Sequence, residues 1–245
     1  MSFLSWLKGK TRKLFDENFT NLYWTCEVCG KEVFNKERFC KECFDNLPFL
    51  EDKICAHCGR RVKASTNYCL SCKNKQTDID LARSVFDYSD AVRLMIHRLK
   101  YKGRRYLARI FAPYLANVYW KNYFNSDLIV YVPMFRKDQR KRGYNQSELL
   151  AKELSKLINV PVLDGVLLKT KRTSKQVGLK RKERKVNLKG SFKLTSKKEI
   201  IDKSILIVDD VMTTGATVER IAELLKKKGA KIVKALTVAS VQITE

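Results

Sequence analysis

Residues 205–217 read Ile205-Leu206-Ile207-Val208-Asp209-Asp210-Val211-Met212-Thr213-Thr214-Gly215-Ala216-Thr217. Four apolar β-formers open this stretch, which is the composition of a strand buried on both faces of a parallel sheet. Two carboxylates follow at the end of the predicted strand, and a short loop of threonines then surrounds one glycine. Residues 217–229 place apolar side chains at helical spacing and end in three lysines and a glycine, as the C-termini of helices often do. The stretch therefore predicts a strand, a loop and a helix.

This strand–loop–helix unit is suited to bind a phosphate group. Loop amides and the N-terminus of a helix attract an anion, and Thr213, Thr214 and Thr217 can add hydroxyl donors. Two carboxylates would repel a bare phosphate, so Asp209 and Asp210 indicate a ligand that also carries vicinal hydroxyls or a divalent cation. A ribose 5-phosphate has such hydroxyls, and a Mg²⁺-bound pyrophosphate brings the cation. The competing interpretation is an ordinary strand–helix turn with a surface pair of aspartates.

The same residues resemble the ribose-phosphate motif of the type I phosphoribosyltransferases, in which an apolar strand, two acidic residues and a Thr-Thr-Gly-Ala-Thr loop follow one another. The resemblance implies a parallel sheet with helices on both faces and a ligand, phosphoribosyl pyrophosphate (PRPP), bound with Mg²⁺. The purine-salvage branch has a carboxylate base where this chain has Thr213, which argues against purine phosphoribosylation. The implied PRPP-binding residues are Asp209, Asp210, Thr213, Thr214, Gly215, Ala216 and Thr217.

Length and charge limit the possible classes of protein. A chain of 245 residues suffices for one large and one small domain. It has no apolar run of about 18 residues and no secretion signal at its start, so we expect a cytoplasmic protein without a membrane span. Residues 1–80 carry 14 basic and 11 acidic side chains, a net charge of +3, whereas residues 81–245 carry 36 and 15, a net charge of +21. This charge favours a polyanionic partner, nucleic acid before anionic membrane; the alternative is a chain kept soluble by lysine.

All eight cysteines precede residue 73 and form an internal repeat. The pattern Cys-x₂-Cys-x₁₀-Cys-x₂-Cys begins at Cys26 and recurs 29 residues later at Cys55, with a glycine after the second cysteine of each copy. Such a turn places two thiolates on one face of a tetrahedral metal, so we predict two structural zinc ions rather than disulfides. The predicted ligands are Cys26, Cys29, Cys40, Cys43, Cys55, Cys58, Cys69 and Cys72.

The spacing leaves two features of this zinc-ribbon module open. Each copy could hold its own ion, or the cysteine pairs could interleave; the sequential repeat favours one ion per copy. His57 is surplus to the eight cysteines, so we do not predict it as a ligand. A module of this size depends on its metal for stability and can serve as a platform for a protein partner or for nucleic acid.

We place the domain boundary near residue 80, so that residues 81–245 form an α/β domain. The predicted helices occupy residues 89–103, 105–123 and a leucine-rich segment after residue 145. Beyond the strand at 205–208, predicted strands occupy residues 82–88, 127–133, 162–168 and 230–239. If the sheet is parallel, the loops after 127–133 and 205–208 open at one edge and form a crevice.

Two basic segments accompany this crevice. The predicted loop 134–145 has five cations in the seven positions 136–142, which suits a pyrophosphate. The phosphoribosyltransferase resemblance implies the same role for this loop, at Phe135, Arg136 and Lys137. Residues 169–189 carry ten Lys or Arg against one acidic residue, with few apolar positions. In the phosphoribosyltransferase resemblance they correspond to the flexible loop that closes over PRPP, with Arg172, Gln176 and Arg184; the alternative is a disordered basic loop.

The combined motifs resemble the ComF family over about residues 26–240. The resemblance implies a cytoplasmic competence protein of natural transformation, which acts on incoming single-stranded DNA together with a helicase-like ATPase. It rests on the double cysteine repeat, on the stretch at 208–217, and on Leu99-Lys100-Tyr101-Lys102-Gly103, Val132-Pro133, Arg142-Gly143-Tyr144-Asn145-Gln146-Ser147-Glu148 and Arg172-x₃-Gln176-x₂-Leu179-x₄-Arg184.

Two functions from different classes remain open at this point. In the first, a competence protein binds a DNA strand through its cations and binds PRPP, or a nucleotide end, at its phosphoribosyl site. In the second, the chain is a metabolic phosphoribosyltransferase of the nucleotide-salvage type with an accessory zinc module. A PRPP-sensing regulator of duplex DNA is disfavoured, because the sequence has no helix-turn-helix motif. No catalytic residue and no acceptor base are predicted. The predicted DNA-binding residues are Lys100, Lys102, Arg140, Arg142, Lys175, Lys180, Arg181 and Lys182.

Overall fold

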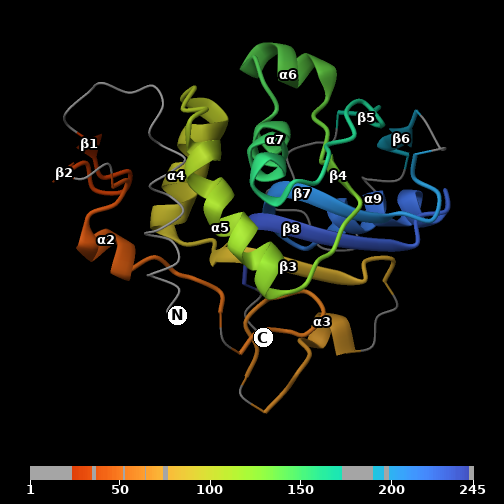
Figure 1. Ribbon diagram of the computed structural model, residues 1–245, viewed down its shortest axis with the longest axis horizontal. Coiled ribbons are helices and arrows are strands. Elements are labelled where there is room, and N and C mark those ends of the chain that lie inside the picture. Colours follow the sequence, from red (N-terminus) through yellow and green to blue (C-terminus); the bar gives the residue numbers. More distant parts are fainter. Residues whose placement is uncertain are drawn as a thin grey trace.

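A four-stranded parallel sheet forms the centre of the protein, as the computed structural model shows (Figure 1). The strands lie in the order β3 (Leu81–Asp87), β8 (Ile232–Ser240), β7 (Ser204–Met212) and β4 (Leu128–Tyr131). All three neighbouring pairs are parallel, so the strands end at a common carboxyl edge. This confirms the predicted α/β class. The structure describes residues 24–34, 37–51, 53–63, 65–73, 77–172, 190–195 and 199–242.

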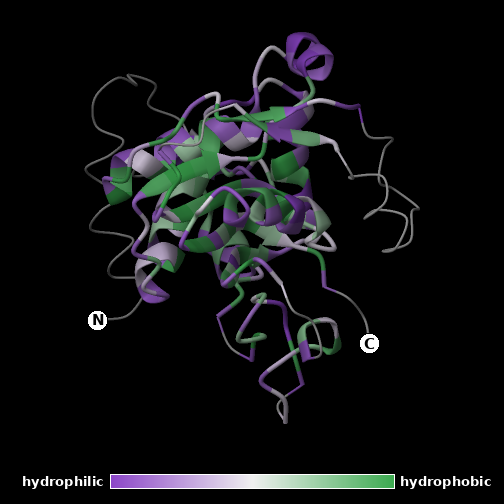
Figure 2. Ribbon diagram, turned by 90° about the vertical axis from the view of Figure 1, so that its right-hand side faces the viewer, coloured by the Kyte–Doolittle hydropathy of each residue, from purple (hydrophilic) through white to green (hydrophobic). Residues whose placement is uncertain are grey.

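The sequence of β7 explains why both faces of the sheet are covered. Leu206 and Val208 belong to one buried cluster, and Ile205 and Ile207 belong to another. Successive side chains of a strand point to opposite faces, so an uninterrupted apolar run needs packing partners on both sides. Figure 2 shows the hydrophobic residues concentrated in the sheet and the helices that pack on it.

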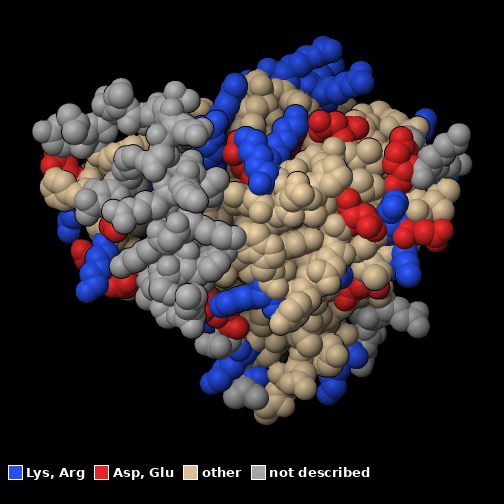
Figure 3. Space-filling view, in the orientation of Figure 1, with Lys and Arg blue, Asp and Glu red and all other residues tan. Residues whose placement is uncertain are grey.

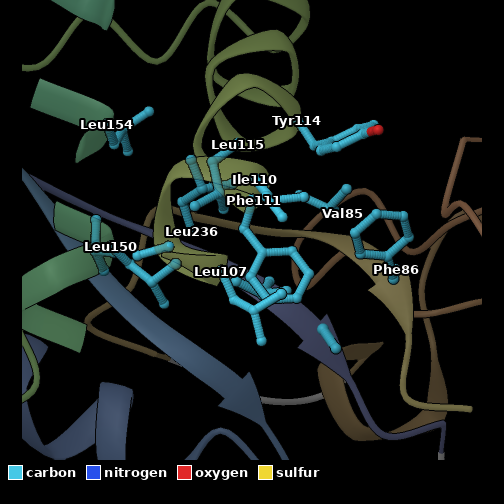
Figure 4. Close-up of a cluster of buried hydrophobic side chains, with 14 of the residues drawn as sticks. Val85, Phe86, Leu107, Ile110, Phe111, Tyr114, Leu115, Leu150, Leu154 and Leu236 are labelled. Atoms are coloured by element: carbon cyan, nitrogen blue, oxygen red, sulfur yellow. The ribbon is translucent and has the colours of Figure 1, made fainter. Parts of the chain in front are cut away.

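Helices cover both faces, as predicted. On one face lie α4 (Asp90–Tyr101), α5 (Leu107–Lys121) and α7 (Gln146–Ile158), and on the other lies α9 (Ala216–Lys226). In the larger core, side chains of α5 and α7 pack on strands β3 and β8; Figure 4 labels Phe86, Phe111, Leu115, Leu150 and Leu236 among them. In the parts of the chain that the structure describes, no helix is both long enough and apolar enough to cross a bilayer.

The prediction of a loop over residues 134–145 was wrong. A short helix, α6 (Arg136–Arg142), occupies the middle of this segment and ends at Gly143, whose φ of 83° is the left-handed conformation that favours glycine. Helix prediction from sequence relies on a periodic apolar face. Because α6 contains only charged and amide side chains and buries none of them, it has no such face.

Two strand predictions were wrong in their limits. In place of a strand over 162–168, a turn at Asp164 and Gly165 interrupts the chain, and β5 (Leu167–Lys169) pairs antiparallel with β6 (Phe192–Leu194). Strand β7 is longer than predicted, because it continues pairing with β8 as far as Met212. The two aspartates therefore lie within the last part of β7 instead of after it.

Two cysteine-rich ribbons precede the sheet and pack on different parts of it. The first contains β1 (Trp24–Thr25), β2 (Glu32–Val33) and α2 (Lys41–Asp45), and its residues share the larger core with α4 and α5. The second ends in α3 (Leu70–Lys73) and lies along the outer edge of β3. There the Ala82 N–H donates to the His57 carbonyl oxygen at 2.8 Å. A Cβ on Gly59 would lie 2.9 Å from the Ala82 carbonyl oxygen, so this close packing requires glycine.

Candidate functional site

The acidic pair of β7 is buried against the first turn of α7. Asp209 and Asp210 are 8% and 4% exposed. Ser147 Oγ donates to Asp209 Oδ1 at 2.7 Å, and Gln146 Nε2 donates to Asp210 Oδ1 at 3.2 Å. The side chain of Asn145 caps this helix by accepting a hydrogen bond from the Ser147 N–H, as asparagine commonly does at an N-cap. The cap fixes the turn that holds both donors.

A lysine from α4 supplies the counter-charge. Lys100 Nζ forms an ion pair with Asp210 Oδ2, and the Lys100 side chain is 22% exposed. Lys100 was predicted to bind DNA, and its place inside the acidic network instead gives it a role in the candidate site. Its neighbour Lys102 lies exposed on the surface, where the predicted DNA contact remains open.

The two carboxyl groups have opposite pKa shifts. Burial, together with the charge of Asp210, raises the pKa of Asp209 to about 8. Burial also disfavours ionisation of Asp210, but the charge of Lys100, together with hydrogen bonds from Lys100, Asp209 and Gln146, outweighs burial and lowers the pKa of Asp210. At neutral pH the pair therefore holds one proton and one negative charge, since two adjacent buried carboxylates cannot both ionise at low cost.

The predicted phosphate loop follows directly after β7. Gly215 has a φ of 80° and is the N-cap of α9, and Thr214 Oγ1 accepts a hydrogen bond from the Ala216 N–H at 3.4 Å. Thr217 lies in the first turn of α9, where the N–H groups have no partner within the helix. The structure thus brings residues 213–217 into one turn beside the acidic pair, and their binding of PRPP stays a prediction.

The basic helix α6 follows the neighbouring strand β4, so it lies at the same edge of the sheet. It projects from the body (Figure 1), and Lys and Arg side chains gather at this end of the molecule (Figure 3). One of its cations turns inwards: the Arg142 guanidinium lies 4.9 Å from the centre of the Tyr101 ring and donates to Gln146 Oε1. An open hollow on the helix is lined by Arg136, Gln139, Arg140 and Gly143.

The start of the predicted flexible loop is attached to α6. Phe135 forms an isolated bridge with Lys169, and Arg172 Nη2 lies 2.8 Å from Asp138 Oδ1. Burial lowers the pKa of Lys169, although the charges of Asp209 and Asp138 oppose that shift. The Lys169 ammonium therefore lies close enough to Asp209 for the two charges to interact. The other residues predicted in this loop lie outside the described residues: Lys175, Gln176, Lys180, Arg181, Lys182 and Arg184.

Three residues of the candidate site have no role predicted from the sequence: Gln146, Ser147 and Lys169. The first two lay within a motif quoted for the ComF resemblance, directly after a good N-cap residue. Polar side chains at the start of an apolar helix are a usable signal for a site, but spacing alone does not show which carboxylates they contact.

The two copies of the cysteine repeat form two separate clusters of thiols. In each copy the four Sγ atoms lie within 4.8 Å of one another, and all eight cysteines are free of disulfides. The Sγ atoms of Cys29 and Cys40 are 3.8 Å apart, and those of Cys58 and Cys69 are 3.7 Å apart. Tetrahedral zinc with a Zn–S distance of about 2.3 Å separates its sulfurs by about 3.8 Å. The thiols therefore fit two zinc ions bound one per copy, and the interleaved alternative is wrong.

Glycines permit the tight turn under each cluster. Gly30 and Gly59 have φ values of 78° and 70°, and their N–H groups donate to the carbonyl oxygens of Cys26 and Cys55 at 2.9 Å. His57 lies outside the cluster, and its Nε2 is 2.9 Å from Thr77 Oγ1. The histidine is therefore not part of the ligand set, as predicted.

Known protein families match the two parts of the chain. The Phosphoribosyl transferase domain matches residues 145–245, and the Double zinc ribbon domain matches residues 23–73. Competence protein F of Haemophilus influenzae is 32% identical over 221 residues, which cover 87% of this chain and 95% of that protein. DNA utilization protein YhgH of Escherichia coli is 32% identical over 214 residues, 85% of this chain and 87% of that protein. Competence protein ComFC of Streptococcus pneumoniae is 28% identical over 197 residues, which cover 80% of this chain and 84% of that protein.

The metal arrangement predicts opposite results for two pairs of cysteine substitutions. We expect the purified protein to hold two zinc ions per chain. Replacing Cys29 and Cys40 by serine removes ligands from one cluster only, so elemental analysis should find about one zinc. Replacing Cys29 and Cys58 removes a ligand from each cluster and should leave almost none. Interleaved pairs would exchange the two results.

The raised pKa of Asp209 predicts how stability depends on pH. Its folded pKa of about 8 exceeds the unfolded value of about 3.9, so the folded state binds more protons between these values. Stability is therefore lost as pH rises through this window, by at most about 1.4 kcal/mol per pH unit. Asp209→Asn should remove this loss. The free energy of unfolding of the variant, measured with urea, should therefore rise relative to that of the parent protein between pH 5.5 and 7.5.

Asp202 provides the matched control for this measurement. It is exposed and has a φ of 59°, which asparagine also tolerates, so Asp202→Asn should follow the parent protein at both pH values. A constant difference between Asp209→Asn and the parent at the two pH values would contradict the buried, protonated state of Asp209.

Proposed function

This chain belongs to the ComF family, and from that membership we propose that it is a competence protein that handles incoming single-stranded DNA and binds PRPP. Relatives named competence protein F and ComFC support the competence role. The finer proposal rests on one observation: a buried acidic pair near the end of β7 and a basic helix after the neighbouring β4 share one sheet edge. A sugar–phosphate ligand matches both, because its hydroxyls suit carboxylates and its phosphates suit cations.

We assign the ribose of PRPP to the acidic pair and its 5-phosphate to the loop 213–217. The pyrophosphate would then lie toward the start of α6, at Phe135, Arg136 and Lys137. The Asp210 carboxylate, and that of Asp209 once its proton leaves, are hard oxygen ligands of the kind that suits Mg²⁺, which neutralises phosphate charge when bound. In the free chain Lys100 provides the positive charge that Asp210 needs while it is buried.

The DNA strand is assigned to the outer surface of α6. This helix carries Arg136, Lys137, Arg140 and Lys141 beside Arg142, and an arginine-lined hollow opens on it. Lys102 adds an exposed cation at the end of α4. We leave Lys100 out of the DNA-binding set, because its ammonium group is already paired with Asp210. With few aromatic side chains among these cations, binding should depend on phosphate contacts more than on base stacking.

A salvage-type phosphoribosyltransferase is the alternative function, and it would use the same acidic pair and loop. Binding of single-stranded DNA separates the two, since a metabolic enzyme has no need of it. The helicase-like ATPase partner and the cytoplasmic location also belong to the proposal, and the partner rests on the family resemblance.

Salt-dependent binding of a labelled oligothymidine tests the DNA assignment. On single strands, log K should fall with log salt concentration with a slope of about −0.7 for each phosphate neutralised. Removing two cations of α6, with Arg140→Gln and Lys141→Gln, should make the slope shallower by about 1.4 and weaken binding at low salt. Fluorescence anisotropy over a series of salt concentrations measures both quantities.

The amino edge of the sheet offers a control with the same loss of charge. Lys203 and Lys231 are exposed just before β7 and β8, at the opposite end of these strands from α6. Lys203→Gln with Lys231→Gln should leave the slope close to that of the parent protein. Failure of the parent protein to bind the oligonucleotide at physiological salt, or an equal effect of both pairs, would overturn the assignment.

A further inference from the structure

One side chain of the second zinc ribbon contacts the backbone of the candidate phosphate loop. Arg60 follows Gly59 in the second Cys-x₂-Cys-Gly turn and is only 5% exposed. Its backbone belongs to the metal turn, because its carbonyl oxygen accepts from the Cys55 N–H at 2.6 Å and its N–H donates to the Cys58 thiol. The position of this residue is thus tied to the geometry of the second thiol cluster.

The guanidinium of Arg60 ends at the carboxyl edge of the sheet. Its Nε donates to the Val241 carbonyl oxygen at 3.2 Å, and its Nη2 donates to the carbonyl oxygen of Thr213, the first residue of the phosphate loop. Val241 is in turn bonded through its N–H to the carbonyl oxygen of Met212 at 3.0 Å. Arg60 therefore joins the chain that follows β8 to the chain that follows β7.

This contact constrains the direction of a loop amide. A trans peptide unit is planar, so its C=O and the next N–H point in opposite directions. With the Thr213 carbonyl directed at Arg60, the N–H of Thr214 points away from the ribbon. A buried guanidinium held by backbone carbonyls also adds positive charge behind the loop, which favours an anion there.

We propose that the second zinc ribbon contributes to phosphate binding, with Arg60 as the positioning residue that couples the metal cluster to loop 213–217. The inference rests on the proposed binding of PRPP at this loop. Because binding free energies are coupled reciprocally, a loaded second cluster strengthens PRPP binding, and bound PRPP retains the zinc. Such couplings are typically about 5- to 150-fold.

The first ribbon lacks this connection in the described part of the chain. It contacts α4 and α5 through Glu27, whose carbonyl oxygen accepts from Arg98 Nη1 at 2.6 Å and whose Oε2 accepts from the Tyr106 hydroxyl at 3.1 Å. Arg98 and Tyr106 belong to α4 and to the start of α5, on the face of the sheet opposite α9. The two zinc ions of one chain should therefore respond differently to PRPP.

Calorimetric titration with Mg²⁺–PRPP tests the positioning role in the full chain, with zinc content measured for each variant. Arg60→Gln should bind about tenfold more weakly while keeping two zinc ions, and Arg60→Lys should recover part of the affinity. Arg61→Gln is the matched control, because Arg61 lies in the same turn but donates to the Phe49 carbonyl oxygen and pairs with Asp87. It should bind PRPP as the parent protein does.

Zinc release to a chromogenic chelator tests the coupling without any variant. Saturating PRPP should slow the release of one zinc per chain severalfold and leave the other unchanged. If neither rate responds, or if zinc-loaded Arg60→Gln binds PRPP as tightly as the parent protein, the coupling is overturned while the PRPP site stands. If the parent protein binds no PRPP, the proposed function fails and this inference fails with it.

Discussion

The interaction on which the rest of the site depends is the pairing of two adjacent buried carboxylates with one lysine. Asp209 and Asp210 lie in a strand covered on both faces, where an unpaired charge is costly. The pair is stabilised by an ion pair with Lys100 and by hydrogen bonds from Gln146 and Ser147. These contacts fix the end of α4 and the first turn of α7 against β7. Replacing a buried ion pair with apolar residues is often neutral or stabilising. The network is therefore weak evidence for fold stability, and under the proposed function it holds the ribose of the ligand.

Segments from distant parts of the chain meet around this pair at the carboxyl edge of the sheet. Helix α6 follows strand β4, the loop at 213–217 follows β7, and Arg60 of the second zinc ribbon contacts the same loop. Open parallel sheets bind ligands at this edge because the loops after neighbouring strands meet there. The zinc module thus contributes to the edge beyond its own stability. Membership in the ComF family is consistent with this arrangement, since the ribbon and the phosphoribosyltransferase-like part occur in one chain.

The features predicted correctly from the sequence are those set by residues close together along the chain. The cysteine spacing predicted two zinc sites, and the apolar run before Asp209 predicted a central parallel strand. The helix α6 was missed because it has no apolar face, and the strand expected at 162–168 was broken by a turn at Gly165. The pairing of Lys100 with Asp210 joins residues 110 positions apart, and it depends on where α4 ends in three dimensions. No spacing rule reports such a contact, so Lys100 was assigned to DNA from its charge alone.

Isothermal titration of Mg²⁺–PRPP into the parent protein and into Asp209→Asn with Asp210→Asn tests the central claim most directly. The account predicts one binding site per chain in the parent protein. Each lost charge-assisted contact should weaken binding by about ten- to a hundredfold, which corresponds to about 1.5–3 kcal/mol. Equal affinity of the double variant and the parent protein would show that the buried acidic pair does not hold the ribose and would contradict the account.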